Sequence, residues 1–173
     1  MKLKDIAATA ISLFGAVIFT DSLRFKFTDH PKTQVIFGAL NDWAGTLGLS
    51  GLFAHTGLFS QYVIGSAELL ASSLLIIGLV PGLKRINALG ALIAAAVMSG
   101  AVSFHLFTPL GIDPNHDGGG LFAAATTLLV GSFILIAIRL PEVKGLLAGL
   151  GRAIVPATPE TNFRAPKLMT CTT

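Results

Sequence analysis

Four polar side chains stand out in a largely apolar chain: Lys26, Gln61, Glu68 and His105. Glu68 is the one charged residue in the run from Gln61 to Val80, and it lies near the middle of that run. A carboxylate inside a membrane-spanning helix is costly, so it marks a functional site or a paired structural site by default. Glu68 is therefore the centre of the candidate site.

The spacing of these residues fits packed helices. Gln61 and Ser72 fall on the same helical stripe as Glu68, and His105 falls on the small-residue face of a later helix. The side chain of Lys26 reaches either outward to water or inward toward Gln61 and Glu68. A direct Lys26–Glu68 contact is not assumed, because a buried ion pair needs excellent geometry to offset its desolvation.

Two interpretations of this constellation stay open. One is a proton-accepting polar pocket that opens outward and suits a quinol head group or a small polar solute. The other is a polar clasp that only fixes how the helices pack. In the pocket, Glu68→Gln abolishes activity in a folded protein. In the clasp, Glu68→Gln is mild and Glu68→Leu lowers thermal stability.

Membrane helices are the elements expected to hold these side chains. Of 173 residues, 53% are hydrophobic and 12% are charged, half the charged fraction of about 25% in soluble domains. About 20 apolar residues cross a hydrocarbon core. Four segments reach that length, at about 5–23, 58–80, 86–107 and 119–140. We therefore predict an all-α fold, an integral membrane four-helix bundle formed by residues 1–140.

Charge in the flanks predicts the orientation. The side that carries both termini holds most of the basic residues, namely Lys2, Lys4, Lys84, Arg85, Arg139, Lys144, Arg152, Arg164 and Lys167. The other side holds Arg24, Lys26 and Lys32. Because basic residues favour the cytoplasmic side, both termini should be cytoplasmic and the loops at 24–57 and 108–118 should face outward.

The long outer loop carries an amphipathic helical pattern. Its apolar stripe consists of Ile36, Leu40, Trp43 and Leu47. Asp29 is expected to cap this helix, with Pro31 in its first turn. Such a helix either lies at the membrane interface or covers the end of the bundle.

Residues 141–173 are expected to form a cytoplasmic, largely disordered tail, because Pro141 should end the fourth span and further prolines follow among polar residues. The single cysteine, Cys171, excludes an intramolecular disulfide and a cysteine-based metal site. The four histidines show no recognised ligand spacing, so no metal site is predicted. The scattered basic residues form no nucleic-acid patch.

The loop before the fourth span has two interpretations. Its polar residues are Asp113, His116 and Asp117, followed by three glycines. A helix N-terminus there could receive a quinone head group or an anion. Alternatively, the loop is a turn in which Asp117 caps the fourth helix.

Several stretches together resemble the DoxX family of small bacterial membrane proteins. They are LRFKF after the first span, LGLSGLF at the end of the outer loop, GSAELLASSLLIIGL in the second span, a third span that ends near a histidine, and HDGGGLF before the fourth. The resemblance covers roughly residues 10–140. By its matching positions, it implies that the family's membrane Glu is Glu68, its basic residue is Lys26 and its third-helix His is His105. Leu121 and Phe122 stand where many relatives have an aromatic residue and a second Glu.

The resemblance also implies a function. It points to a subunit or accessory of a quinone-linked redox system in a bacterial cytoplasmic (inner) membrane, with a quinone as ligand and other membrane or redox subunits as partners. The two rival functions are a small-solute or proton pathway and a purely structural membrane subunit.

Overall fold

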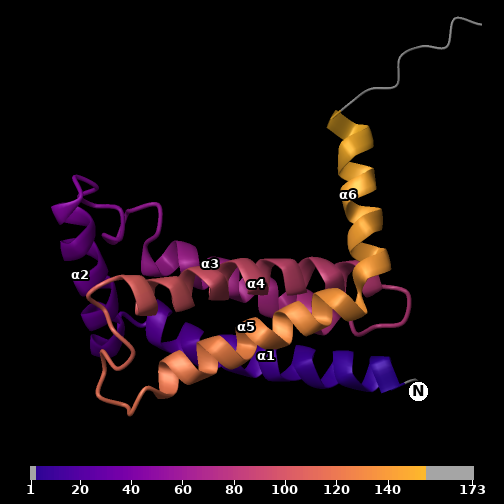
Figure 1. The fold of residues 1–173 in the computed structure, drawn as a ribbon, viewed down its shortest axis with the longest axis horizontal. Helices are drawn as coiled ribbons and strands as arrows, with labels where there is room; N and C mark the ends of the chain where they lie inside the picture. The colour runs from indigo at the N-terminus through magenta and orange to yellow at the C-terminus, as the bar shows by residue number, and fades with distance from the viewer. Residues whose placement is uncertain (1–2, 155–173) are drawn as a thin grey trace, which may run out of the picture.

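The computed structural model describes residues 3–154, in which all regular structure is α-helical (Figure 1). Its helices are α1 (Leu3–Phe27), α2 (Pro31–Thr46), α3 (Gln61–Ile77), α4 (Lys84–Phe107), α5 (Gly120–Ile138) and α6 (Leu140–Ile154). Helices α1, α3, α4 and α5 pack alongside one another, α2 lies across one end, and α6 begins at the other end, where the N-terminus also lies (Figure 1).

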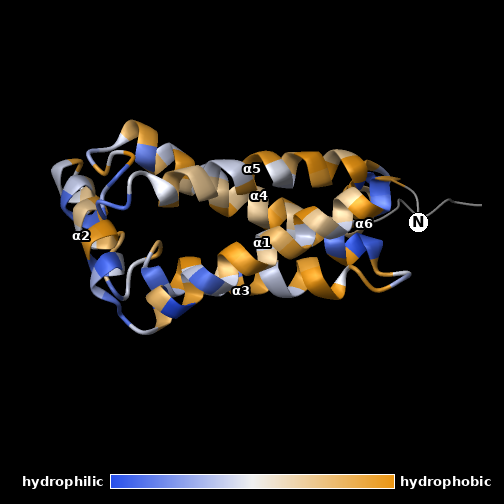
Figure 2. Cartoon of the chain, turned by 90° about the horizontal axis from the view of Figure 1, so that it is seen from below, coloured by the Kyte–Doolittle hydropathy of each residue, from blue (hydrophilic) through white to orange (hydrophobic). Residues whose placement is uncertain are grey.

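Within residues 3–154, three helices, α1, α4 and α5, are long and apolar enough to cross a membrane. Figure 2 shows hydrophobic residues mainly along the helix shafts and hydrophilic residues mainly toward the ends. α3 has 17 residues and is shorter than the expected span of 58–80. It starts late because Ser60 is its N-cap, with the hydroxyl accepting a hydrogen bond from the N–H of Val63. It ends early at Gly78, where a turn toward α4 begins.

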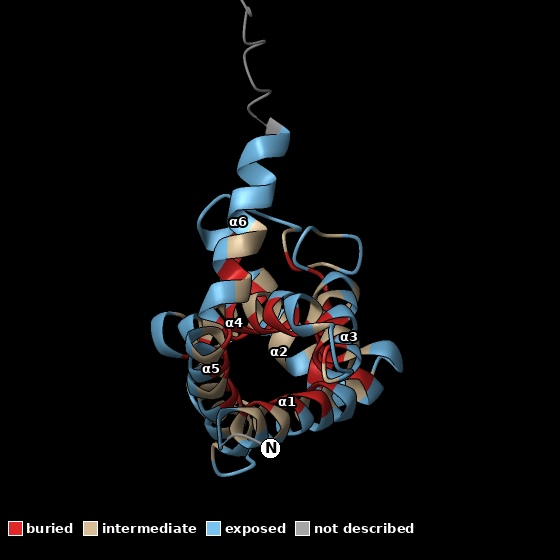
Figure 3. Cartoon of the chain, turned by 90° about the vertical axis from the view of Figure 1, so that its right-hand side faces the viewer, coloured by how far each residue is buried: buried red, intermediate tan, exposed pale blue. Residues whose placement is uncertain are grey.

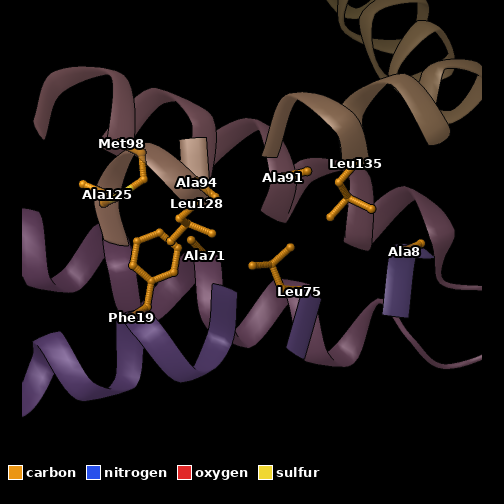
Figure 4. Packing of buried hydrophobic residues seen from close by; sticks show 10 residues of the cluster. All are labelled: Ala8, Phe19, Ala71, Leu75, Ala91, Ala94, Met98, Ala125, Leu128 and Leu135. Carbon is orange, nitrogen blue, oxygen red and sulfur yellow. The ribbon is translucent and has the colours of Figure 1, made fainter. Parts of the chain in front are cut away.

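A hydrophobic core runs between α1, α3, α4 and α5. Small residues on α4, Ala91 and Ala94, face larger side chains such as Phe19, Leu75 and Leu128 (Figure 4). Seen along the helices, the buried positions face inward and the exposed positions face outward (Figure 3). Small side chains on one helix that face larger side chains on its neighbours allow the helices to lie close together.

The outer loop forms helix α2, which covers one end of the core helices. Leu40 and Ala44 of α2 pack with Phe53 and Leu110, so the apolar face of this helix rests on protein. This favours the cap over the interfacial helix. Pro31 is the first residue of α2, as predicted, but the predicted cap is wrong. His30, and not Asp29, caps the helix, since its ring nitrogen accepts a hydrogen bond from the N–H of Lys32.

The chain after α5 differs from the expectation. Pro141 does not end a helix: α5 has already ended at Ile138, and Pro141 is the second residue of α6. Proline is tolerated there because the first N–H groups of a helix have no intrahelical partner. Helix α6 therefore replaces the beginning of the expected disordered tail. The remainder of that tail, with Cys171, lies outside the described residues.

Candidate functional site

Lys26 and Glu68 form a direct ion pair. The Lys26 ammonium lies 3.0 Å from Oε2 of Glu68 and donates a 3.1 Å hydrogen bond to Oε1. It also donates to the hydroxyl of Ser22, one turn earlier on α1. The Glu68 side chain is 4% exposed, and its Oε2 atom accepts no hydrogen bond. The pair is therefore buried, with one carboxylate oxygen that has acceptor capacity left.

Gly65 explains how the lysine reaches the carboxylate. A β-carbon at Gly65 would lie 3.5 Å from both Cβ and Cδ of Lys26. The lysine stem therefore runs along α3 at the point where that helix has no side chain. Its head group then meets Glu68, which lies three residues further along the same face.

Gln61 connects this pair to the outer loop. Its amide donates to the backbone carbonyl of Lys26 at 2.9 Å and to the carboxylate of Asp29 at 2.8 Å. Its own carbonyl accepts a 2.8 Å hydrogen bond from Gln34 of α2. Asp29 also lies 3.4 Å from His55. The first residue of α3 thus ties the end of α1 and the cap helix together.

A cavity of about 660 Å³ lies at the α2 end of the core helices. Lys26, Glu68 and His105 all line it. Its wall is otherwise mainly apolar and includes the aromatic residues Phe19, Phe25, Phe37, Phe53, Phe59 and Phe104. Gln61 does not line this cavity but borders a smaller one of about 120 Å³ beside α2. Three of the four predicted residues therefore share one cavity, and Gln61 is connected to it through Lys26.

His105 is held in the cavity wall by two contacts. Its Nδ1 lies 2.6 Å from the carbonyl oxygen of Gly111. Because a carbonyl only accepts, Nδ1 carries the proton of that hydrogen bond, which leaves Nε2 available to another partner. The ring also packs edge-on against Phe122 of α5, with centroids 5.6 Å apart. His105 is thus positioned independently of the ion pair.

The loop before α5 supports the capping interpretation. The Asp117 carboxylate accepts hydrogen bonds from the N–H groups of Gly119, Gly120 and Leu121. Desolvation by burial raises the pKa of this carboxyl. The hydrogen bonds that it makes with the N–H of Leu121, the side chain of Asp113 and the N–H groups of Gly119 and Gly120 lower the pKa by more. The pKa of Asp117 therefore lies below its ordinary value of 3.8. The carboxylate occupies the N–H groups that a bound anion would need.

A second buried polar cluster lies at the opposite end and was not predicted. Asn87 is fully buried, donating to the Ser12 hydroxyl at 2.9 Å and to the carbonyl of Leu75 at 3.1 Å. Arg139 donates to the Asn87 side chain at 3.0 Å and lies 3.7 Å from Asp5. This cluster joins all four core helices or their ends, and its hydrogen bonds describe a structural clasp. In the sequence, Arg139 was counted only as a basic residue that favours the cytoplasmic side, and no pattern singled out Asn87.

No family model, no curated protein and no solved structure matches this chain. The resemblance to the DoxX family therefore rests on the quoted sequence motifs alone.

Proposed function

We propose that this chain is a DoxX-like integral membrane protein that binds the head group of a lipophilic quinone in the 660 Å³ cavity and serves as a subunit or accessory of a quinone-linked redox system. The observation that carries the proposal is the buried Lys26–Glu68 pair in the wall of a mainly apolar cavity. Ligand sites typically combine apolar walls with a few convergent polar groups.

Each polar group would have a distinct role toward such a ligand. The Lys26 ammonium can donate to a quinone oxygen, and Oε2 of Glu68 can accept the hydroxyl proton of a quinol. His105 offers Nε2 as a second proton-accepting atom, because Nδ1 carries the ring proton. The aromatic wall suits the flat ring of the head group, since aromatic faces and edges pack well together. A bound quinone would supply the electron-transfer chemistry.

The proposal includes the membrane arrangement. α3, at about 1.5 Å per residue, reaches about 26 Å, close to the thickness of a hydrocarbon core of about 30 Å. With α3 as the fourth span, α1, α3, α4 and α5 would form a transmembrane four-helix bundle. We place it in a bacterial cytoplasmic membrane with both termini on the cytoplasmic side, beside other redox subunits. The position of the N-terminus and α6 at one end supports this arrangement (Figure 1).

The core counts against the rival pathway. Beyond the cavity, toward the other end of the helices, Leu75 of α3, Ala91 of α4 and Leu135 of α5 belong to the packed hydrophobic core. A solute or proton route would need polar groups or water across that layer. A purely structural role remains the competing function, and a binding measurement separates it from the proposal.

Trp43 provides the measurement, because it is the only tryptophan in the chain. Its ring packs edge-on against Phe104, which lines the cavity, with centroids 6.5 Å apart. A short-chain ubiquinone analogue, titrated into purified protein in nanodiscs, should quench its fluorescence with saturation. Glu68→Gln should weaken binding at least tenfold, or about 1.4 kcal/mol.

Ser66→Ala is the matched control, since Ser66 lies on the exposed side of the same helix. It should bind the analogue as the unmutated protein does. Linear, unsaturable quenching that is equal in all three proteins would show only partitioning into lipid. That result would reject the quinone site and leave the structural role.

A further inference from the structure

Helix α6 leaves the core helices in a direction transverse to them (Figures 1 and 3). Only Arg139 separates the end of α5 at Ile138 from the start of α6 at Leu140. α6 therefore begins at the level at which a long apolar helix ends. If α5 crosses a membrane, α6 runs along the surface of that membrane, not away from it.

The sequence of α6 divides it into two faces. At about 100° per residue, one face collects the apolar residues Leu140, Val143, Leu146, Leu147 and Leu150, and the other collects Glu142, Lys144, Ala148 and Arg152. Val143 is 7% exposed, whereas Leu147 and Leu150 are 62% and 59% exposed. The apolar face thus begins on the protein and continues beyond it, without a partner among the described residues.

The position of Arg85 indicates which way these faces point. A β-carbon at Gly145 would lie 3.7 Å from the Arg85 guanidinium, and Gly145 lies on the side of α6 opposite Val143. Arg85 itself is exposed. The polar face of α6 therefore lies on the same exposed side as Arg85. The apolar face is turned toward the core helices and the medium around them.

We propose that α6 is an interfacial helix bound to a lipid surface. Its apolar face would insert at the boundary between head groups and acyl chains in the leaflet beside the Lys84 end of α4. Lys144, Arg152 and Arg85 would lie at head-group level, where their charge is complementary to anionic phosphates. This inference goes beyond the quinone site and needs only that α5 spans the membrane.

Spin labels on adjacent residues of α6 test the proposal in the full chain. In a Cys171→Ser background, Leu147→Cys and Ala148→Cys place a nitroxide on the apolar and the polar face. The probe system is liposomes of phosphatidylcholine and phosphatidylglycerol, with oxygen and a water-soluble nickel complex as relaxing agents. Val130→Cys, on an exposed position of α5, gives the reference for a lipid-facing label.

The label at residue 147 should be reached by oxygen more than by nickel, as at residue 130, and the label at 148 should show the reverse. In liposomes without phosphatidylglycerol, the difference in oxygen and nickel access between the labels at 147 and 148 should become smaller. Equal nickel access at both positions would overturn the proposal, because α6 would then lie in water. Protection of residue 147 from both agents, with dipolar broadening between labels, would overturn it in favour of a second copy of the chain.

Discussion

The ammonium of Lys26 lies 3.0 Å from Oε2 of Glu68, and this contact joins the last turn of α1 to the middle of α3. Removing both charges from water costs several kcal/mol per ion, and their attraction offsets that cost only with good geometry and further hydrogen bonds. Here the lysine donates two hydrogen bonds, to Oε1 of Glu68 and to the Ser22 hydroxyl, while the carboxylate accepts one, and its Oε2 atom accepts none. The pair is thus better satisfied on the side of the lysine than on the side of the carboxylate.

That imbalance distinguishes the two polar clusters. Around Asn87, both amide hydrogens and the carbonyl oxygen have partners within the chain. Around Glu68, an acceptor atom remains and a cavity adjoins it. A cluster that is complete by itself fixes helix packing, whereas an incomplete one beside a cavity has room for a ligand.

The sidedness of the chain gives the first prediction. In a Cys171→Ser background, a cysteine at the exposed position Ser50 should react with an impermeant maleimide added to intact cells. A cysteine at the exposed position Ala148 should react only after the membrane is opened, if that end is cytoplasmic as its basic residues predict. Labelling of Ala148→Cys in intact cells, with Ser50→Cys protected, would reverse the orientation.

The close approach of α3 and α4 gives the second prediction. A β-carbon at Gly90 would lie 2.8 Å from the backbone nitrogen of Leu75, so Gly90→Ala must push the two helices apart. We expect it to lower stability by about 1–3 kcal/mol, the usual cost of overpacking. Thermal unfolding in detergent, followed by fluorescence of Trp43, measures this.

Gly100→Ala is the control on the same helix. A β-carbon there would meet only Phe104, at 4.0 Å. Alanine is also the better helix former by about 1 kcal/mol, so this variant should be neutral or slightly more stable. Equal destabilisation by the two variants would mean that the helix contact at Gly90 is not as close as described.

The regular parts of the fold were accessible from the sequence because their signals are local. Apolar length placed α1 and α4 within a few residues of their observed bounds. The burial of Glu68 and Gln61 also followed from their shared stripe on α3. Such predictions need only the period of the helix.

The faces of α5 and the partner of Asn87 were not accessible in this way. α5 is apolar all round, so its sequence alone does not indicate which of its faces packs inward. In the structure the buried residues of this helix are Ala125, Leu128, Ser132 and Leu135. Arg139 was counted as a charge in a flank, because its bond to Asn87 spans 52 residues and only the assembled fold brings the two together.

The cap of α5 gives the third prediction, which concerns pH. Because the pKa of Asp117 is lowered below 3.8 in the folded protein, its carboxylate stabilises the fold above that value, and the contribution is lost as pH falls through the lower, folded pKa. Asp117→Ala should cost about 1 kcal/mol at pH 7. The difference from the unmutated protein should shrink only below about pH 4. Thermal unfolding between pH 7 and pH 3 measures both the loss of stability at neutral pH and its decrease in acid.

Asp42→Ala serves as its control, since Asp42 is exposed on α2. This variant should match the unmutated protein at neutral pH. An Asp117→Ala difference that is unchanged down to pH 3 would show that hydrogen bonding to the ionised carboxylate is not what stabilises the loop.

The last prediction separates structure from binding at the Lys26–Glu68 pair. Glu68→Gln leaves the buried ammonium without its counter-charge, and Lys26→Met leaves the carboxylate without its donor. Each should lower stability by about 3 kcal/mol, the cost of breaking a buried pair. The direct contact thus replaces the mild effect of Glu68→Gln that a clasp without this ion pair would show. Lys26→Met combined with Glu68→Leu removes both charges and should lose less than the sum of the two single losses. Chemical unfolding of the variants in the same detergent measures the coupling.

Ligand binding in these same proteins decides what the pair does. If the pair is only a clasp, the apolar double variant regains stability, and none of these proteins, including the unmutated one, shows saturable quenching of Trp43. If the cavity holds a quinone head group, the double variant regains stability but still fails to show saturable quenching of Trp43, because the donor and the acceptor are both gone. Saturable binding of equal affinity in the double variant and the unmutated protein would remove Lys26 and Glu68 from the binding site, whatever their effect on folding.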